Sequence, residues 1–112
     1  YVHHFALQLY DAGGLYTLSN QPSSEMTANR IEQLGNAPYA TNDRAFYIYF
    51  DEATDGYRVK DNWCPEPLFD ANRPGPANVW INNGPTVSDS IKSAAGLQPE
   101  YNYLKDSIHE TN

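Results

Sequence analysis

The sequence ANRI at 28–31 returns as DNWC at 61–64, so Asn29 and Asn62 lie 33 residues apart. In each case a short aromatic and aliphatic segment with acidic neighbours precedes the asparagine. A unit that recurs at this period is typical of a solenoid, in which each coil buries its apolar face only against neighbouring coils. We therefore expect Asn29 and Asn62 to occupy equivalent bends on successive coils.

The segments between these bends have the pattern of short strands. The run AFYIYF at 45–50 is rich in aromatic and β-branched residues, and polar and apolar residues alternate over 58–60 and 78–82. No long segment of 1–84 keeps the apolar period of a helix. Short strands that are interrupted by Gly, Asn, Asp and Pro predict an all-β fold, a right-handed parallel β-helix.

An asparagine at a sharp bend can stack on the asparagine of the next coil and satisfy backbone groups there. Asn29, Asn62 and Asn82 are the candidates for such a ladder, and the third lies only 20 residues after the second. Solenoid coils absorb such differences of length in loops on one face. The segments 35–44 and 65–76 are the predicted loops.

The two ends of the chain differ. Ser88 can begin a helix that Gly96 ends, and Pro99 can begin a further short turn. We therefore predict about three coils over 1–84 and a helical cap with a tail over 85–112. The chain opens inside a strand, so we expect missing N-terminal coils. The remainder of the same protein, or another chain, would then cover this edge, and the isolated segment would fold poorly and be inactive.

Composition limits the partners. The chain has 112 residues, is 40% apolar and carries 7 basic against 14 acidic residues, a net charge of −7. This charge disfavours nucleic acid and anionic membranes as partners, and no membrane-spanning stretch is visible. A neutral carbohydrate is easier to accommodate. Cys64, the single cysteine, takes the place of Ile31 in the repeat, so we expect both side chains to be inward and apolar.

Several short motifs follow one another in a fixed order: DAGGLYTLSNQP at 11–22, YFDE at 49–52, NVW at 78–80 and AAGLQPEY at 94–101. This order resembles the C-terminal part of bacterial right-handed parallel β-helix glycoside hydrolases. It most resembles glycoside hydrolase family 141, which includes α-L-fucosidase and xylanase activities on plant cell-wall polysaccharides. The resemblance implies a secreted, periplasmic or cell-surface bacterial glycosidase without a cofactor. The chain departs from the family's pattern at Ala12 and at 53–55, where a larger residue and a Gly-Ser turn are common.

The resemblance also implies a catalytic pair, Asp11 and Asp51, with Glu52 competing for the second position. Glycoside hydrolysis needs a protonated carboxyl and a carboxylate, roughly 5–5.5 Å apart for retention or 6.5–9.5 Å for inversion. Neighbouring strands lie about 4.8 Å apart and can supply such a spacing. Aspartate is also common in turns, where it bonds its own backbone, and without the resemblance that interpretation is favoured. Asp11 has the less charged neighbours and is the predicted acid.

Other residues are candidates for the substrate site. Gly13 and Gly14 are expected to let the backbone turn and to leave room for a sugar. His3, Tyr16 and Tyr49 are the predicted substrate-binding residues. The rings of His3 and His4 should point to opposite faces of their strand. Residues 51–56 resemble a calcium loop but lack ligands that it needs, so no metal site is predicted.

Two other functions remain open. The chain can be a non-catalytic, glycan-binding β-helix of a surface protein or tailspike. It can also be a polysaccharide lyase, which would need a basic residue such as Arg44, Arg58 or Lys60 beside bound calcium. Carboxyl groups of Asp11 and Asp51 that converge in one place would favour the glycosidase.

Overall fold

The computed structural model describes residues 1–37 and 45–107. Most of the regular structure in these ranges is β, and two short helices follow the strands. In chain order, the elements are β1 (Val2–Phe5), β2 (Ala12–Thr17), β3 (Asn20–Thr27), β4 (Ile31–Leu34), β5 (Ala45–Phe50), β6 (Asp55–Lys60), β7 (Phe69–Ala71), β8 (Val79–Ile81), α1 (Asp89–Ala94) and a 3₁₀ helix (Pro99–Ser107).

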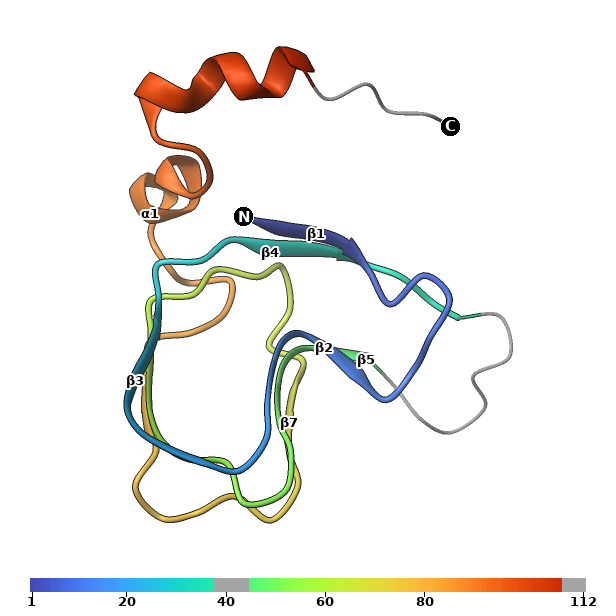
Figure 1. The fold of residues 1–112 in the computed structure, drawn as a ribbon, viewed down its shortest axis with the longest axis vertical. Coiled ribbons are helices and arrows are strands. Elements are labelled where there is room, and N and C mark those ends of the chain that lie inside the picture. Colours follow the sequence, from blue (N-terminus) through green and yellow to red (C-terminus); the bar gives the residue numbers. More distant parts are fainter. Residues whose placement is uncertain (38–44, 108–112) are drawn as a thin grey trace.

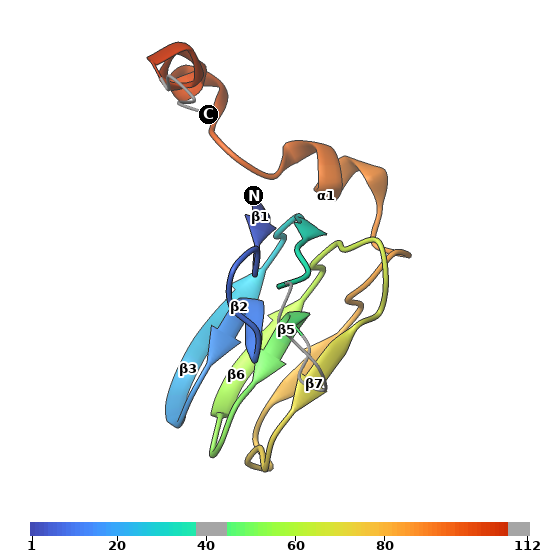
Figure 2. The same ribbon diagram turned by 90° about the vertical axis from the view of Figure 1, so that its right-hand side faces the viewer.

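The strands form three parallel sheets in stacked register, with the orders β1-β4, β2-β5-β7 and β3-β6-β8. Every pairing joins one pass of the chain to the next: Leu15 lies beside Ile48, and Ile48 lies beside Phe69. Figure 1 shows the passes superimposed, and Figure 2 shows them side by side. This arrangement is consistent with the coils of a parallel β-helix.

The core runs through the middle of the stack. Ile31, Ile48, Val59 and Cys64 are fully or almost fully buried there, so the predicted inward positions of Ile31 and Cys64 are confirmed. Burial raises the pKa of the Cys64 thiol to about 11. Cys64 is therefore an uncharged apolar side chain at neutral pH.

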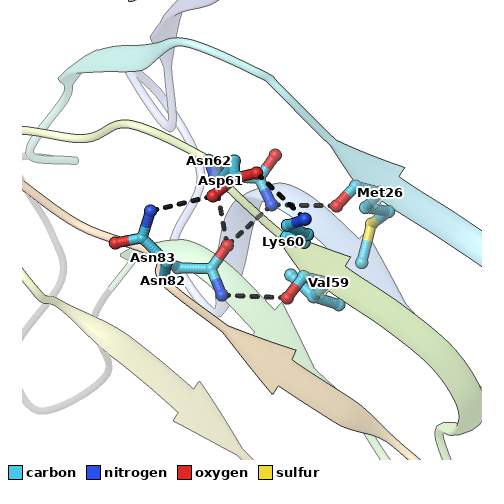
Figure 3. A network of polar contacts seen from close by, with 7 residues as sticks. All are labelled: Met26, Val59, Lys60, Asp61, Asn62, Asn82 and Asn83. Carbon is cyan, nitrogen blue, oxygen red and sulfur yellow. Dashed lines mark hydrogen bonds and ion pairs between the residues drawn. The ribbon is translucent and has the colours of Figure 1, made fainter. Parts of the chain in front are cut away.

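A ladder of asparagines fixes one bend of the coils (Figure 3). The buried Asn62 accepts hydrogen bonds from the backbone and side-chain nitrogens of Asn29, at 3.1 and 2.8 Å. Its own Nδ2 donates to the carbonyl of Met26 at 2.9 Å and to Oδ1 of Asn83 at 2.8 Å. The predicted pairing of Asn29 with Asn62 is confirmed, and the third member of the ladder is Asn83.

Asn82, the predicted third member, lies at the bend itself. Its φ of 51° is left-handed, as are those of Ala28 at 56° and Asp61 at 57°, which precede the other two ladder asparagines. Its amide donates to Oδ1 of Asp61 at 2.8 Å instead. The prediction is wrong by one residue because β8 pairs with β6 at an offset of 21 residues, with Lys60 beside Ile81.

The predicted loops have different outcomes. In segment 35–44, residues 35–37 follow β4 and belong to no strand, and residues 38–44 lie outside the described residues. Segment 65–76 contains β7, so the prediction of a loop there is wrong for residues 69–71. The third pass reaches Phe69 soon after Cys64, without the excursion that carries β1 and β4 in the first two passes.

The C-terminal helices begin where the sequence predicts. The Oγ of Ser88 caps α1 by accepting from the amide of Ile91, and Gly96 follows the helix with a φ of 120°. Figure 1 shows both helices above β1 and β4. Lys92 of α1 lies 3.8 Å from the ring centre of Trp63, a contact that attaches the helix to the coils. Within 1–37 and 45–107 no helix is long and apolar enough to span a membrane.

Candidate functional site

Asp51, directly after β5, has a carboxylate that three donors hold. The Tyr16 hydroxyl donates to Oδ2, Nδ2 of Asn72 donates to Oδ1 at 3.0 Å, and the Glu52 amide donates to Oδ1 at 2.7 Å. These bonds, led by the one from Tyr16, lower the pKa of Asp51 because they favour the charged form. Asp51 is therefore ionised at neutral and mildly acidic pH.

Tyr49 continues this site toward Asp11. Tyr49 lies beside Tyr16 in the register of β2 and β5, and the ring centres are 5.4 Å apart at 78°. Burial, and then a hydrogen bond to Asp11, raise the pKa of Tyr49 to about 12. Tyr49 therefore keeps its proton at neutral pH. The residues form a row in the order Asp11, Tyr49, Tyr16 and Asp51, which we call the Asp–Tyr row.

The two aspartates of this row lie at different places on their coils. Asp11 precedes β2, whereas Asp51 follows β5, so they are not at equivalent positions. Figure 1 shows that the chain turns sharply along β2 and β5. The two tyrosines, rather than the spacing between adjacent strands, therefore connect the carboxyl groups.

The glycines after Asp11 have a different role from the predicted one. A Cβ at Gly13 would lie 2.7 Å from the carbonyl oxygen of Leu15 and 2.9 Å from Cβ of Tyr49. A Cβ at Gly14 would lie 2.5 Å from Cγ2 of Ile31. Protein atoms fill the space beside both glycines, so the expectation that they leave room for a sugar is wrong. They allow the close packing of the bend.

Glu52 and His3 lie apart from the row. Glu52 pairs with Arg73 at 3.3 Å, and both side chains are largely exposed. His3 is on β1, where it stacks on Tyr1 with ring centres 4.6 Å apart. The Nδ1 atoms of His3 and His4 are 2.6 Å apart, so the prediction of opposite faces is wrong. His4 has a φ of 53°, which breaks the alternation of side chains along the strand.

The basic residues considered for a lyase are elsewhere. Arg58 and Lys60 are on β6, in a different sheet from β5, and Lys60 lies 3.7 Å from the Asp61 carboxylate. Arg44 lies outside the described residues. In the part of the chain that the structure describes, no three His, Cys, Asp or Glu side chains are grouped to hold a metal ion.

Sequence reasoning missed two residues of the site, Asn72 and Asp70. Asn72 bonds to Asp51, which lies 21 residues earlier, and Asp70 pairs in register with Tyr49 at the same offset. The shorter period of the third coil is the sequence signal that could have identified these two residues. A shift of 21 residues instead of 33 aligns Asn72 with Asp51.

Among known proteins, the chain is similar to a solved structure. No protein-family model matches the chain, and no curated protein matches it. A solved structure described as a glycoside hydrolase has 41% sequence identity to this chain and a TM-score of 0.87 over 91% of it. The chain spans 17% of the length of that protein. In sequence and in fold, it is therefore similar to a part of a glycoside hydrolase.

Proposed function

We propose that this chain is part of a glycoside hydrolase and that the Asp–Tyr row is its catalytic site. Two observations support the proposal: the similarity to a glycoside hydrolase at 41% identity, and two carboxyl groups joined through Tyr49 and Tyr16. The coils would belong to a right-handed parallel β-helix, the hand that crossover connections between parallel strands almost always take.

Asp51 is the carboxylate of the pair. Three donors commit it to the ionised form, so it can attack the anomeric carbon or activate a water molecule. The leaving oxygen needs a proton from a second carboxyl group. Because its donors hold Asp51 in the ionised form, Asp11, the other carboxyl group of the row, is proposed as the acid. Glu52, which pairs with Arg73, has no part in this assignment.

The substrate proposed is a neutral, plant-type polysaccharide, and the activity is α-L-fucosidase- or xylanase-like, as in glycoside hydrolase family 141. The exposed ring of Tyr16 offers a face on which a sugar can stack. The chain carries a net charge of −7, and the negative charges of Asp11, Asp51 and Asp70 all contribute to the raised pKa of Tyr49. An anionic sugar would therefore be repelled from this site. We place the protein outside the bacterial cytoplasm, where such polymers are found. His3, on another sheet, stays a prediction without a role in this mechanism.

Sugar release from defined polymers tests the proposal. The protein is incubated with xylan, with fucosylated xyloglucan and, as the anionic control, with polygalacturonate, and the products are separated by chromatography. We expect xylo-oligosaccharides or free fucose and no products from polygalacturonate. Binding without any release would support the glycan-binding alternative, and products with an unsaturated sugar end would support a lyase.

A further inference from the structure

The three hydrogen bonds to the Asp51 carboxylate are divided unequally between its two oxygens. Oδ1 accepts from the Glu52 amide at 2.7 Å and from Nδ2 of Asn72 at 3.0 Å, whereas Oδ2 accepts from the Tyr16 hydroxyl. Each carboxylate oxygen has two lone pairs that can accept hydrogen bonds. In the part of the chain that the structure describes, both lone pairs of Oδ1 are therefore used, and one lone pair of Oδ2 stays open.

Asn72 is fixed beside Asp51 by its own backbone. Its amide donates to the carbonyl of Phe50 at 2.7 Å, and the carbonyl of the next residue, Arg73, accepts from the amide of Ala53 at 3.1 Å. These two bonds continue the parallel pairing of β5 with β7 past the end of β7. They lie on either side of Asp51 in the sequence, so the pairing of the coils sets the position of the Asn72 amide.

Neutral donors alone keep Asp51 ionised. The titratable groups around it are acids, tyrosines and an arginine: Asp11 before β2, Tyr16 on β2, Tyr49 on β5, Glu52 after β5, Asp70 on β7 and Arg73 after β7. Arg73 pairs with Glu52 at 3.3 Å, and in 1–37 and 45–107 no ion pair joins Asp51 to a Lys, Arg or His side chain. Loss of the Asn72 amide is therefore not compensated by a cation.

We infer that Asn72 is a positioning residue for Asp51 and that Oδ2 of Asp51 is the reacting oxygen. The inference rests on the proposed function. The bonds to Oδ1 orient the carboxylate and leave the open lone pair of Oδ2 for the reaction. Acting as a base, Oδ2 takes a proton from a water molecule, whose oxygen forms the new bond to the anomeric carbon. The glycosidic oxygen leaves with the electron pair of its broken bond and takes a proton from Asp11.

The chain contains a matched contact away from the Asp–Tyr row. Nδ2 of Asn82 donates to Oδ1 of Asp61 at 2.8 Å, across the same offset of 21 residues as the bond from Asn72 to Asp51. Both asparagines are exposed, and both aspartates are half-buried. If such contacts only support the stack of coils, the two asparagines should be equivalent. Asn82→Gly, which suits the left-handed φ of 51° at this bend, is therefore the control.

Two measurements on the same variants test the inference. Carbon-13 NMR of the carboxyl groups gives the pKa of Asp51, and hydrolysis of xylan and of fucosylated xyloglucan gives the pH profile of kcat/KM. Asn72→Ala should raise the pKa of Asp51 toward its ordinary value and move the acidic limb to higher pH, because a donor to the charged form is lost. Asn72→Asp, which has the same shape and adds a negative charge, should move both further.

A further readout separates orientation from ionisation. At a pH where Asp51 is ionised in every variant, Asn72→Ala should still lower kcat by about ten-fold or more, since a misplacement of about 1 Å can cost about 100-fold. Asn82→Gly should leave the pKa of Asp51, the acidic limb and this kcat unchanged.

The outcomes are distinct. An unchanged pKa of Asp51 in both Asn72 variants would overturn the inference, as would an equal shift in Asn82→Gly. A raised pKa with an unmoved acidic limb and a normal kcat would overturn it and leave the proposed function standing. A raised pKa in a protein that releases no sugar from either polymer would support the placement of Asp51 by Asn72 and overturn the proposed function.

Discussion

The hydroxyl of Tyr16, on one coil, donates a hydrogen bond to the carboxylate of Asp51 on the next, and this is the first cause of the lowered pKa of Asp51. Replacing Tyr16 with Phe removes the donor, so the pKa of Asp51 should rise toward its ordinary value. If Asp51 must be ionised for catalysis, the acidic limb of the pH profile of kcat/KM should move to higher pH.

A pH profile of both proteins measures this shift. Tyr101→Phe is the matched control, since Tyr101 is 48% exposed against 47% for Tyr16 and lies in the C-terminal 3₁₀ helix. Coincident acidic limbs for Tyr16→Phe and the unmodified protein would show that Asp51 does not control the profile. The lowered pKa also implies stability that is present above the unfolded-state pKa and is lost as the pH falls through the folded-state value.

The asparagine ladder makes a prediction about stability. Asn62→Ala removes the acceptor of the backbone and side-chain nitrogens of Asn29 and the donor to the Met26 carbonyl, whereas Oδ1 of Asn83 keeps the bond from the backbone amide of residue 62. Each buried group left unpaired costs about 1–3 kcal/mol. Denaturant unfolding should therefore show a loss of about 3 kcal/mol or more. Asn82→Gly, which keeps the left-handed bend and removes only an exposed amide, should change the free energy of unfolding by much less; equal losses would contradict this role of the ladder.

The close packing at Gly14 makes a second prediction about stability. Gly14→Ala places a methyl group 2.5 Å from Cγ2 of Ile31 and 3.0 Å from the ring of Phe5. Overpacking of this kind costs about 1–3 kcal/mol. Since removal of the Ile31 side chain relieves the contact, Gly14→Ala and Ile31→Ala together should cost less than the two separate losses. Strictly additive losses in a double-mutant cycle would mean that Ile31 is not the obstacle.

The separation of the two carboxyl groups predicts the stereochemistry. Asp11 and Asp51 bond to different tyrosines, whose ring centres are 5.4 Å apart, and the structure gives no direct bond between them. Because two tyrosine side chains lie between the carboxyl groups, we expect the wider of the two catalytic spacings, roughly 6.5–9.5 Å, which leaves room for a water molecule. Proton NMR of the first product formed should therefore show inversion at the anomeric carbon. Retention would require the carboxyl groups to approach each other when substrate binds.

The sequence predicts the repeating part of this fold well because the repeat is local. Asn29 and Asn62 share an offset of 33 residues with the pairing of the strands around them, so the first two coils can be aligned without a structure. The third coil cannot be aligned in this way, because Asn82 and Asn83 are adjacent asparagines. Only the pairing of β6 with β8 decides which of them joins the ladder. β7 has three residues and no pattern of its own; its hydrogen bonds to β5 define it.

The sequence indicates which residue types belong to the candidate site better than it indicates how they are arranged. Tyr16 contacts both Asp51 and Tyr49 across adjacent coils, and the role of these residues and of Asp11 in a site stays a prediction. The way they are connected depends on a bend within β2 and β5, which strand patterning does not reveal. The roles of Asn72 and Asp70 depend on the offset of the third coil, and hence on contacts distant in the sequence.

The central claim is that Asp11 and Asp51 are the catalytic pair, and turnover of the natural glycan by single Asp→Asn variants tests it most directly. We expect Asp11→Asn and Asp51→Asn each to lower kcat by about 10²–10⁴-fold while the unfolding transition stays nearly unchanged. Glu52→Gln, at the neighbouring position, should keep near-normal turnover, and a substrate with a low-pKa leaving group should partly rescue Asp11→Asn alone. Normal turnover in both aspartate variants would contradict the account.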